Sequence, residues 1–97
     1  MIQIVKVRGV SMAPTLAPGD YLLVTKARAI RSGFVVLVNH PKYGTIVKRV
    51  ATVSQQSVTL SGDGSESTST EALGKIPIAN IKGRVRLAIT PKGLKRI

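Results

Sequence analysis

The chain has 97 residues, of which 43% are hydrophobic and only Tyr21, Phe34 and Tyr43 are aromatic, and its net charge is +11. The absence of cysteine excludes disulfides, thiol catalysis and cysteine-ligated zinc. The single histidine, His40, excludes a multi-histidine metal site, so we expect neither a metal nor a cofactor. This length and apolar content are typical of one folded domain, and we expect residues 1–97 to form it around an aliphatic core.

Short runs of β-branched and aliphatic residues, separated by turn residues, predict strands along most of the chain. The expected strands span residues 2–7, 21–26, 34–39, 45–53, 58–61 and 76–89, the last interrupted at 80–83. No segment shows a sustained 3.6-residue period, so no helix is expected, and the polar segment 62–74 is expected to be a loop. His40 precedes Pro41 and is expected in a surface loop. Closely spaced short strands predict an all-β fold, a small curled antiparallel sheet or barrel.

The basic residues are unevenly distributed. No acidic residue follows Glu71, whereas the remaining 26 residues contain Lys75, Lys82, Arg84, Arg86, Lys92, Lys95 and Arg96. This imbalance favours an anionic partner, which is a nucleic acid, a lipid surface or an acidic protein, although a solvated basic face is the simpler interpretation. Three aromatic residues make a poor platform for stacking bases, so nucleic acid is the less favoured partner.

No stretch approaches the roughly 20 apolar residues that a membrane-spanning helix needs. The N-terminal sequence MIQIVKVRG is too short and too charged for a signal peptide. We therefore expect a protein that is cytoplasmic or peripheral to the membrane, with the basic C-terminal segment as the possible contact with an anionic membrane surface.

The sequence TIVKRVATV contains a candidate catalytic base. A lysine can activate a serine when an apolar setting keeps its amine neutral. In a strand Lys48 shares a face with Ile46 and Val50, whereas Arg49 lies on the other face, and arginine cannot act as a base because it does not deprotonate. Lys48 is therefore the candidate of this pair, and the alternative is a lysine that extends into solvent from an edge strand.

The stretch GVSMAPTLAPGDYLLV, followed by IVKRV, resembles bacterial signal peptidase I and its soluble relatives over residues 8–85. The resemblance implies the all-β peptidase fold, Ser11 as the nucleophile and Lys48 as the general base. Met12 would pack beneath the serine and help to enclose the lysine. Pro14 would stiffen the loop and so lower the entropy of holding the nucleophile.

A third motif of the family, a glycine–aspartate turn before a polar run, is matched in part. The matching positions are Gly62, Asp63, Ser67 and Gly74. Ser67 falls where the family has a serine that orients the lysine, with Ser65 and Ser69 as alternatives. Ser69 and Glu71 stand where the family has aspartate and arginine, and Gly64 replaces an asparagine, so a supporting ion pair is expected to be lost.

Gly9 lies two residues before Ser11, where some family members have a serine that donates to the oxyanion. Glycine has no such donor, so the backbone N–H of Ser11 would form most of the oxyanion hole. The expected function is a serine endopeptidase that removes an N-terminal leader from a protein substrate, similar in type to the maturation protease of nickel superoxide dismutase.

Three alternatives stay open. Self-cleaving repressors of the LexA type have a similar serine, lysine and β fold, but their Ala-Gly cleavage site is not found in the ten residues before Ser11. A family member that has kept the fold and lost activity fits the degraded third motif. A basic β-barrel that binds nucleic acid without catalysis fits the charge.

Overall fold

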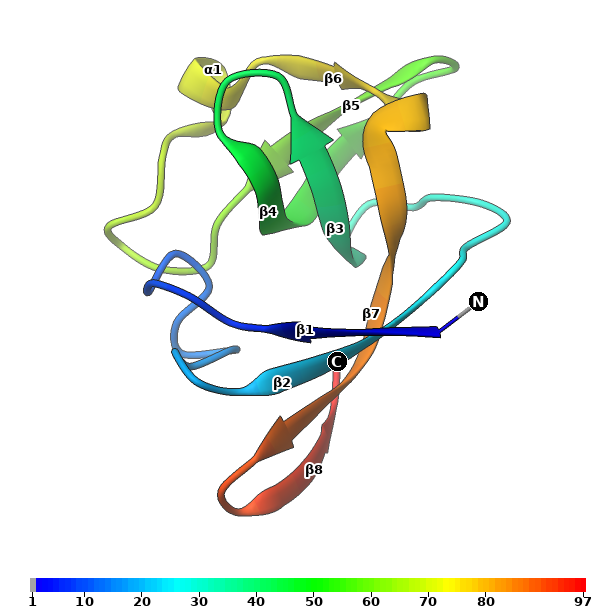
Figure 1. Ribbon diagram of the computed structural model, residues 1–97. Coiled ribbons are helices and arrows are strands. Elements are labelled where there is room, and N and C mark those ends of the chain that lie inside the picture. The colour runs from blue at the N-terminus through cyan, green and yellow to red at the C-terminus, as the bar shows by residue number, and fades with distance from the viewer. Residues whose placement is uncertain (1) are drawn as a thin grey trace.

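The computed structural model describes residues 2–97 and consists mostly of strands (Figure 1). The eight strands of this part of the chain form one antiparallel sheet with the order β1-β2-β7-β3-β4-β5-β6, and β8 pairs with β7. The expected all-β fold with a curled antiparallel sheet is confirmed. The elements are β1 (Ile2–Lys6), β2 (Tyr21–Thr25), β3 (Val35–His40), β4 (Gly44–Val53), β5 (Ser57–Ser61), α1 (Thr70–Leu73), β6 (Lys75–Pro77), the 3₁₀ helix η1 (Ile78–Asn80), β7 (Ile81–Thr90) and β8 (Gly93–Arg96).

Strand β7 joins the two ends of the molecule. Its first residues pair with β3, and its later residues pair with β2 and β8. A Cβ atom at Gly83 would lie 2.6 Å from a side-chain carbon of Val24 and 2.7 Å from the carbonyl oxygen of Thr25, so glycine permits this close approach of β2. The sheet curls here, which places β1, β2 and β8 at one end and β3 to β6 at the other (Figure 1).

Two aliphatic clusters lie on the two sides of strand β3. Val35 and Leu37 belong to one cluster, and Val36 and Val38 belong to the other. Successive side chains of a strand point to opposite faces, so a strand buried on both faces has a continuous apolar sequence. The first cluster also contains Met12 and Leu16, which come from the segment between β1 and β2. The core therefore anchors the segment that carries Ser11.

The expected secondary structure is wrong in the last third of the chain. The polar segment 62–74 contains the one-turn helix α1, and Ser69 caps it because its Oγ accepts the N–H of Ala72 at 3.1 Å. A helix of four residues is too short to show a period. The break expected at 80–83 lies at η1 instead, and β7 continues through Gly83. Strand β8 was not expected, because Pro91 and Gly93 indicate a turn without showing that a strand follows it. No helix among residues 2–97 has the length and apolar character needed to cross a bilayer.

His40 is buried at the end of β3 and does not lie in a surface loop. Its Nδ1 accepts the backbone N–H groups of Lys42 and Tyr43, at 3.0 and 3.2 Å, so its Nε2 carries the proton and donates to the carbonyl oxygen of Leu73 at 2.9 Å. The ring therefore closes the β3–β4 turn and ties it to α1. Burial is possible here because the three hydrogen bonds satisfy both ring nitrogens.

Candidate active site

The loop between β1 and β2 holds Ser11 at its first turn. The N–H of Ala13 donates to the carbonyl oxygen of Val10 at 3.0 Å, and the N–H of Leu16 donates to the carbonyl oxygen of Met12 at 2.9 Å. Met12 and Leu16 are buried, which anchors the loop from below, and Ser11 stays half-buried. The bond between Ala13 and Pro14 is cis. Ser11 is thus presented on a loop whose neighbours are fixed by the core.

Lys48 is buried on strand β4. It lies opposite Val36 in the ladder, and only 5% of the residue is exposed. Among residues 2–97 the one ion pair joins Arg49 to Asp63, so the Lys48 amine has no carboxylate partner there. Desolvation disfavours the charged form and lowers the pKa of Lys48 below its ordinary value of 10.5. These are the surroundings that a lysine base requires.

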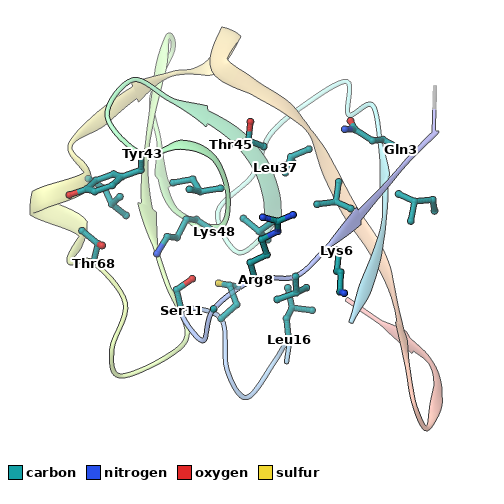
Figure 2. Close-up of a pocket in the computed structure, with 18 residues that line it drawn as sticks. Gln3, Lys6, Arg8, Ser11, Leu16, Leu37, Tyr43, Thr45, Lys48 and Thr68 are labelled. Atoms are coloured by element: carbon teal, nitrogen blue, oxygen red, sulfur yellow. The ribbon is translucent and has the colours of Figure 1, made fainter. Parts of the chain in front are cut away.

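Ser11 and Lys48 line the same pocket, which has a volume of about 690 Å³. Figure 2 shows the Ser11 hydroxyl and the Lys48 amine turned toward each other at one end of it, with Tyr43 and Thr68 nearby. The other lining residues are Gln3, Ile4, Val5, Lys6, Val7, Arg8, Gly9, Met12, Leu16, Leu37, Thr45, Ile46, Val47 and Leu73. The pocket therefore extends from the serine and lysine along β1 and the first half of β4.

The third-motif segment, residues 62–74, packs directly on the backbone around Ser11. The N–H of Gly64 donates to the carbonyl oxygen of Ser11 at 2.7 Å. A Cβ at Gly64 would lie 2.3 Å from the carbonyl oxygen of Val10, and one at Gly62 would lie 2.6 Å from that of Ser11. Both positions need glycine because no side chain fits between these two stretches of backbone. Glycine at position 64 is therefore required by the close approach of the Val10 backbone, and it is more than the loss of the family's asparagine side chain.

Asp63 joins the loop of Ser11 to the strand of Lys48. Its carboxylate accepts bonds from Arg49 Nε at 2.8 Å and Arg49 Nη2 at 2.7 Å, and a further bond from the Thr15 hydroxyl. The Arg49 hydrogen bonds hold the pKa of Asp63 below its ordinary value, and the same contact raises the pKa of Arg49. Ser69 and Glu71, which stand where the family has aspartate and arginine, form no ion pair within residues 2–97. A different ion pair, between Arg49 and Asp63, supports this region. Turn geometry alone does not explain Asp63.

The hydroxyl that the third-motif segment brings to the pocket belongs to Thr68. Ser67, expected to orient the lysine, packs against Gly62 and is not one of the lining residues. Of the two alternatives, Ser65 is not one of the lining residues either, and Ser69 caps α1. Thr68 is the next residue along the chain after Ser67, and nothing in the sequence singled it out as a lining residue of the pocket. Tyr43 and Leu73 were missed as well, because the turn and the helix that carry them were not predicted.

Gly9 lies at the edge of the pocket with φ of +73°, a conformation that favours glycine, and no heavy atom lies within 4 Å of the position of its Cβ. This position is explained by the turn into the Ser11 loop. It supplies no side-chain donor, as expected.

The model of the family described as Peptidase S24-like matches residues 2–86. The chain belongs to this family. The match spans the serine loop, the lysine strand and the third-motif segment, and it includes the pocket between them. No curated protein and no solved structure matches the chain. A Peptidase S24-like chain is related to serine peptidases and to self-cleaving proteins of the LexA type, so the match supports that wider group and not signal peptidase I in particular.

Proposed function

We propose that this Peptidase S24-like protein is a serine endopeptidase in which Ser11 is the nucleophile and Lys48 the general base. The observation that carries the proposal is the buried Lys48 amine, which has no carboxylate partner among residues 2–97 and faces Ser11 across one pocket (Figure 2). A lysine buried only for structure is expected to pair its charge, because burying an unpaired charge is unfavourable. A lowered pKa in a cleft is instead typical of a catalytic group.

In the proposed reaction the neutral Lys48 amine takes the proton of the Ser11 hydroxyl as its oxygen attacks the substrate carbonyl. The backbone N–H of Ser11 donates to the resulting oxyanion. The Lys48 ammonium then gives the proton to the leaving amine, and an ester with Ser11 remains. Lys48 activates the water that hydrolyses this ester. We assign to the Thr68 hydroxyl, in place of Ser67, the task of accepting a hydrogen bond from the Lys48 amine and so orienting it.

The substrate is an extended peptide that pairs with open strand edges. Within the described chain β1 pairs with β2 alone, and β4 pairs with β5 only from Arg49 onward, so residues 44–48 have one free edge. The pocket lies along both open edges. A peptide that adds a strand here would form main-chain hydrogen bonds and bring one carbonyl to Ser11. We propose that the peptide is an N-terminal leader of another protein, with small side chains at the cleaved bond.

The family match also favours a second candidate, cleavage of a segment attached to the same chain, as in relatives of the LexA type. Both candidates use the same serine and lysine. They differ in the kinetics of cleavage, because an intramolecular reaction is independent of protein concentration.

The test is to incubate the protein with the proteins of a cell lysate and to identify newly formed N-termini by mass spectrometry. Ser11→Ala and Lys48→Met provide the background. We expect new N-termini with the wild type alone, preceded by small residues. If the wild type and both variants give the same N-termini, in the lysate and in the protein itself, the proposed activity is wrong.

A further inference from the structure

Four strands at one end of the molecule share a face that points away from the core. The ladder places Lys6 of β1 opposite Tyr21 of β2, Tyr21 opposite Ile89 of β7, and Ile89 opposite Leu94 of β8. All four side chains are exposed, Leu94 by 72% and Tyr21 by 45%. Directly paired residues of neighbouring strands point to the same side of a sheet, so these residues form one continuous row.

A second row lies beside the first on the same face. It contains Ile4, Leu23, Leu87 and Arg96, which are paired in the same way across the four strands. Ile4 is 54% exposed, and Ile2, two residues before it, is 67% exposed. We call the two rows together with Ile2 the outer face. Exposed apolar residues are common singly, but a contiguous group of this kind indicates a contact surface.

The charges on and around the outer face are of one sign. Lys6 and Arg96 end the two rows, and Lys92 lies in the turn between β7 and β8 (Figure 1). The four strands contain no acidic residue. Of the four acids in the chain, Asp20 is buried, Asp63 is paired with Arg49, and Glu66 and Glu71 belong to the segment before β6. The partner of this face must therefore accept apolar side chains and supply negative charge.

We propose that the outer face docks on an anionic lipid bilayer. Aliphatic side chains and a tyrosine enter the interfacial region of a bilayer, while lysines and arginines contact its acidic headgroups. A second copy of the chain would bring cations against cations. Nucleic acid would leave the aliphatic rows without a suitable contact, because the face has one aromatic ring for stacking.

The part of the outer face that lies on β7 and β8 is separate from the pocket, whereas Ile4 and Lys6 of β1 line it. Lys95 points to the other side of the sheet, where its Nζ donates to the carbonyl oxygen of Thr15 at 2.7 Å. Lys95 therefore supports the Ser11 loop and is left unchanged in any test. Ile89, Lys92, Leu94 and Arg96 do not line the pocket. Docking and cleavage can thus be tested with different residues, and the docking proposal does not depend on the proposed function.

The experiment measures co-sedimentation with vesicles of phosphatidylcholine alone and of phosphatidylcholine mixed with phosphatidylserine. We expect binding to the mixed vesicles that decreases as salt shortens the Debye length from about 10 Å at 0.1 M to about 3 Å at 1 M. The double variant Lys92→Gln/Arg96→Gln, and separately Leu94→Ser, should each lower the partition coefficient about tenfold. The matched control Arg31→Gln/Lys75→Gln removes the same charge from exposed positions elsewhere and should have a much smaller effect.

Four results would overturn the proposal. The first is an absence of binding to the mixed vesicles. The second is an equal fall of the partition coefficient in the control variant, which would show that binding depends on net charge alone. The third is a dimer in analytical ultracentrifugation that Leu94→Ser dissociates. The fourth is tighter binding to duplex DNA or RNA than to the vesicles, lost in the same variants. Circular dichroism confirms that each variant is folded before it is tested.

Discussion

Strand β4 places two adjacent cations in opposite surroundings. Lys48 faces the core with 5% of its surface exposed and no carboxylate partner among residues 2–97, and burial lowers its pKa. Arg49 faces the other side with 33% of its side chain exposed, is held by Asp63, and has a raised pKa. One residue of displacement along a strand reverses the face and therefore the environment. The proposed chemistry therefore belongs to Lys48, whose pKa is lowered, whereas Arg49 holds the segment of Asp63 against β4.

The largest expected effect is the loss of the proposed dyad. Ser11→Ala and Lys48→Met should each reduce turnover on the order of a millionfold, because a serine and its base act as a unit, and the double variant should be little worse than either single one. Lys48→Met keeps the apolar contacts of the chain and removes the burial penalty, so it should fold. Single-turnover kinetics on a cleaved substrate provide the measurement.

Lys48→Arg is the matched control for charge. Arginine keeps a cation at this position and does not deprotonate, so it should be as inactive as Lys48→Met. Substantial cleavage by either Lys48 variant would mean that another group is the base.

The next effect concerns the contact between the third-motif segment and Ser11, the proposed nucleophile. Gly64→Ala places a methyl group 2.3 Å from the Val10 carbonyl oxygen, so the Ser11 backbone must move. We expect a loss of about 1–3 kcal/mol in stability and about 100-fold in turnover, because nucleophile geometry is sensitive to shifts of about 1 Å. Chemical denaturation and steady-state kinetics measure the two losses.

Gly83→Ala is the matched control for crowding. This glycine is equally crowded, with Val24 and Thr25 nearby, and it does not line the pocket. The variant should lose stability and keep its turnover per folded molecule. If both glycine variants lose turnover equally, the contact at Gly64 has no special role in placing Ser11.

A smaller effect is expected from Asp63→Asn, which breaks the pair with Arg49. We expect a loss of about 1–2 kcal/mol near neutral pH, because the pair is bidentate but partly exposed. The folded-state pKa of Asp63 is lowered, so its contribution is complete above the ordinary value of 3.8 and disappears as the pH falls through the lower folded value. The stability difference between wild type and variant should therefore shrink in acid, as urea denaturation at several pH values can show.

Glu66→Gln is the control for that experiment. Glu66 is exposed in the same segment, so its replacement should change stability by no more than about 0.5 kcal/mol at any pH. A constant difference for Asp63→Asn down to the lowest pH would show that the Asp63 charge adds no stability.

The sequence predicted the strands well where a period of two was combined with clear turns, as in β2 and β4. It also identified Ser11 and Lys48 as candidates, but the strand pattern alone did not decide whether Lys48 or Arg49 faces the core. Pairing with β3 does not decide it either, because Val35 opposite Arg49 and Val36 opposite Lys48 are both buried. The two faces differ in what covers them, since Asp63 holds Arg49 and no carboxylate pairs with Lys48 among residues 2–97. A strand pattern gives two faces and does not say which one a neighbouring strand will cover.

The missed features all depend on contacts between distant segments. Asp63 looked like a turn residue because its partners Arg49 and Thr15 are 14 and 48 positions away. Gly64 looked like a lost side chain because the Val10 carbonyl oxygen beside it belongs to another loop. His40 looked exposed because Leu73, its acceptor, lies in a helix too short to predict.

The central claim is that Lys48 can lose its proton under mild conditions, and NMR titration of its side-chain amine tests this most directly. The protein is labelled with ¹³C and ¹⁵N at lysine, and Lys48→Arg assigns the signal. Burial in the absence of an acidic partner predicts a Lys48 pKa below its ordinary value of 10.5. A Lys48 signal that titrates below this value is the predicted result. A Lys48 signal that titrates at 10.5 would contradict the account.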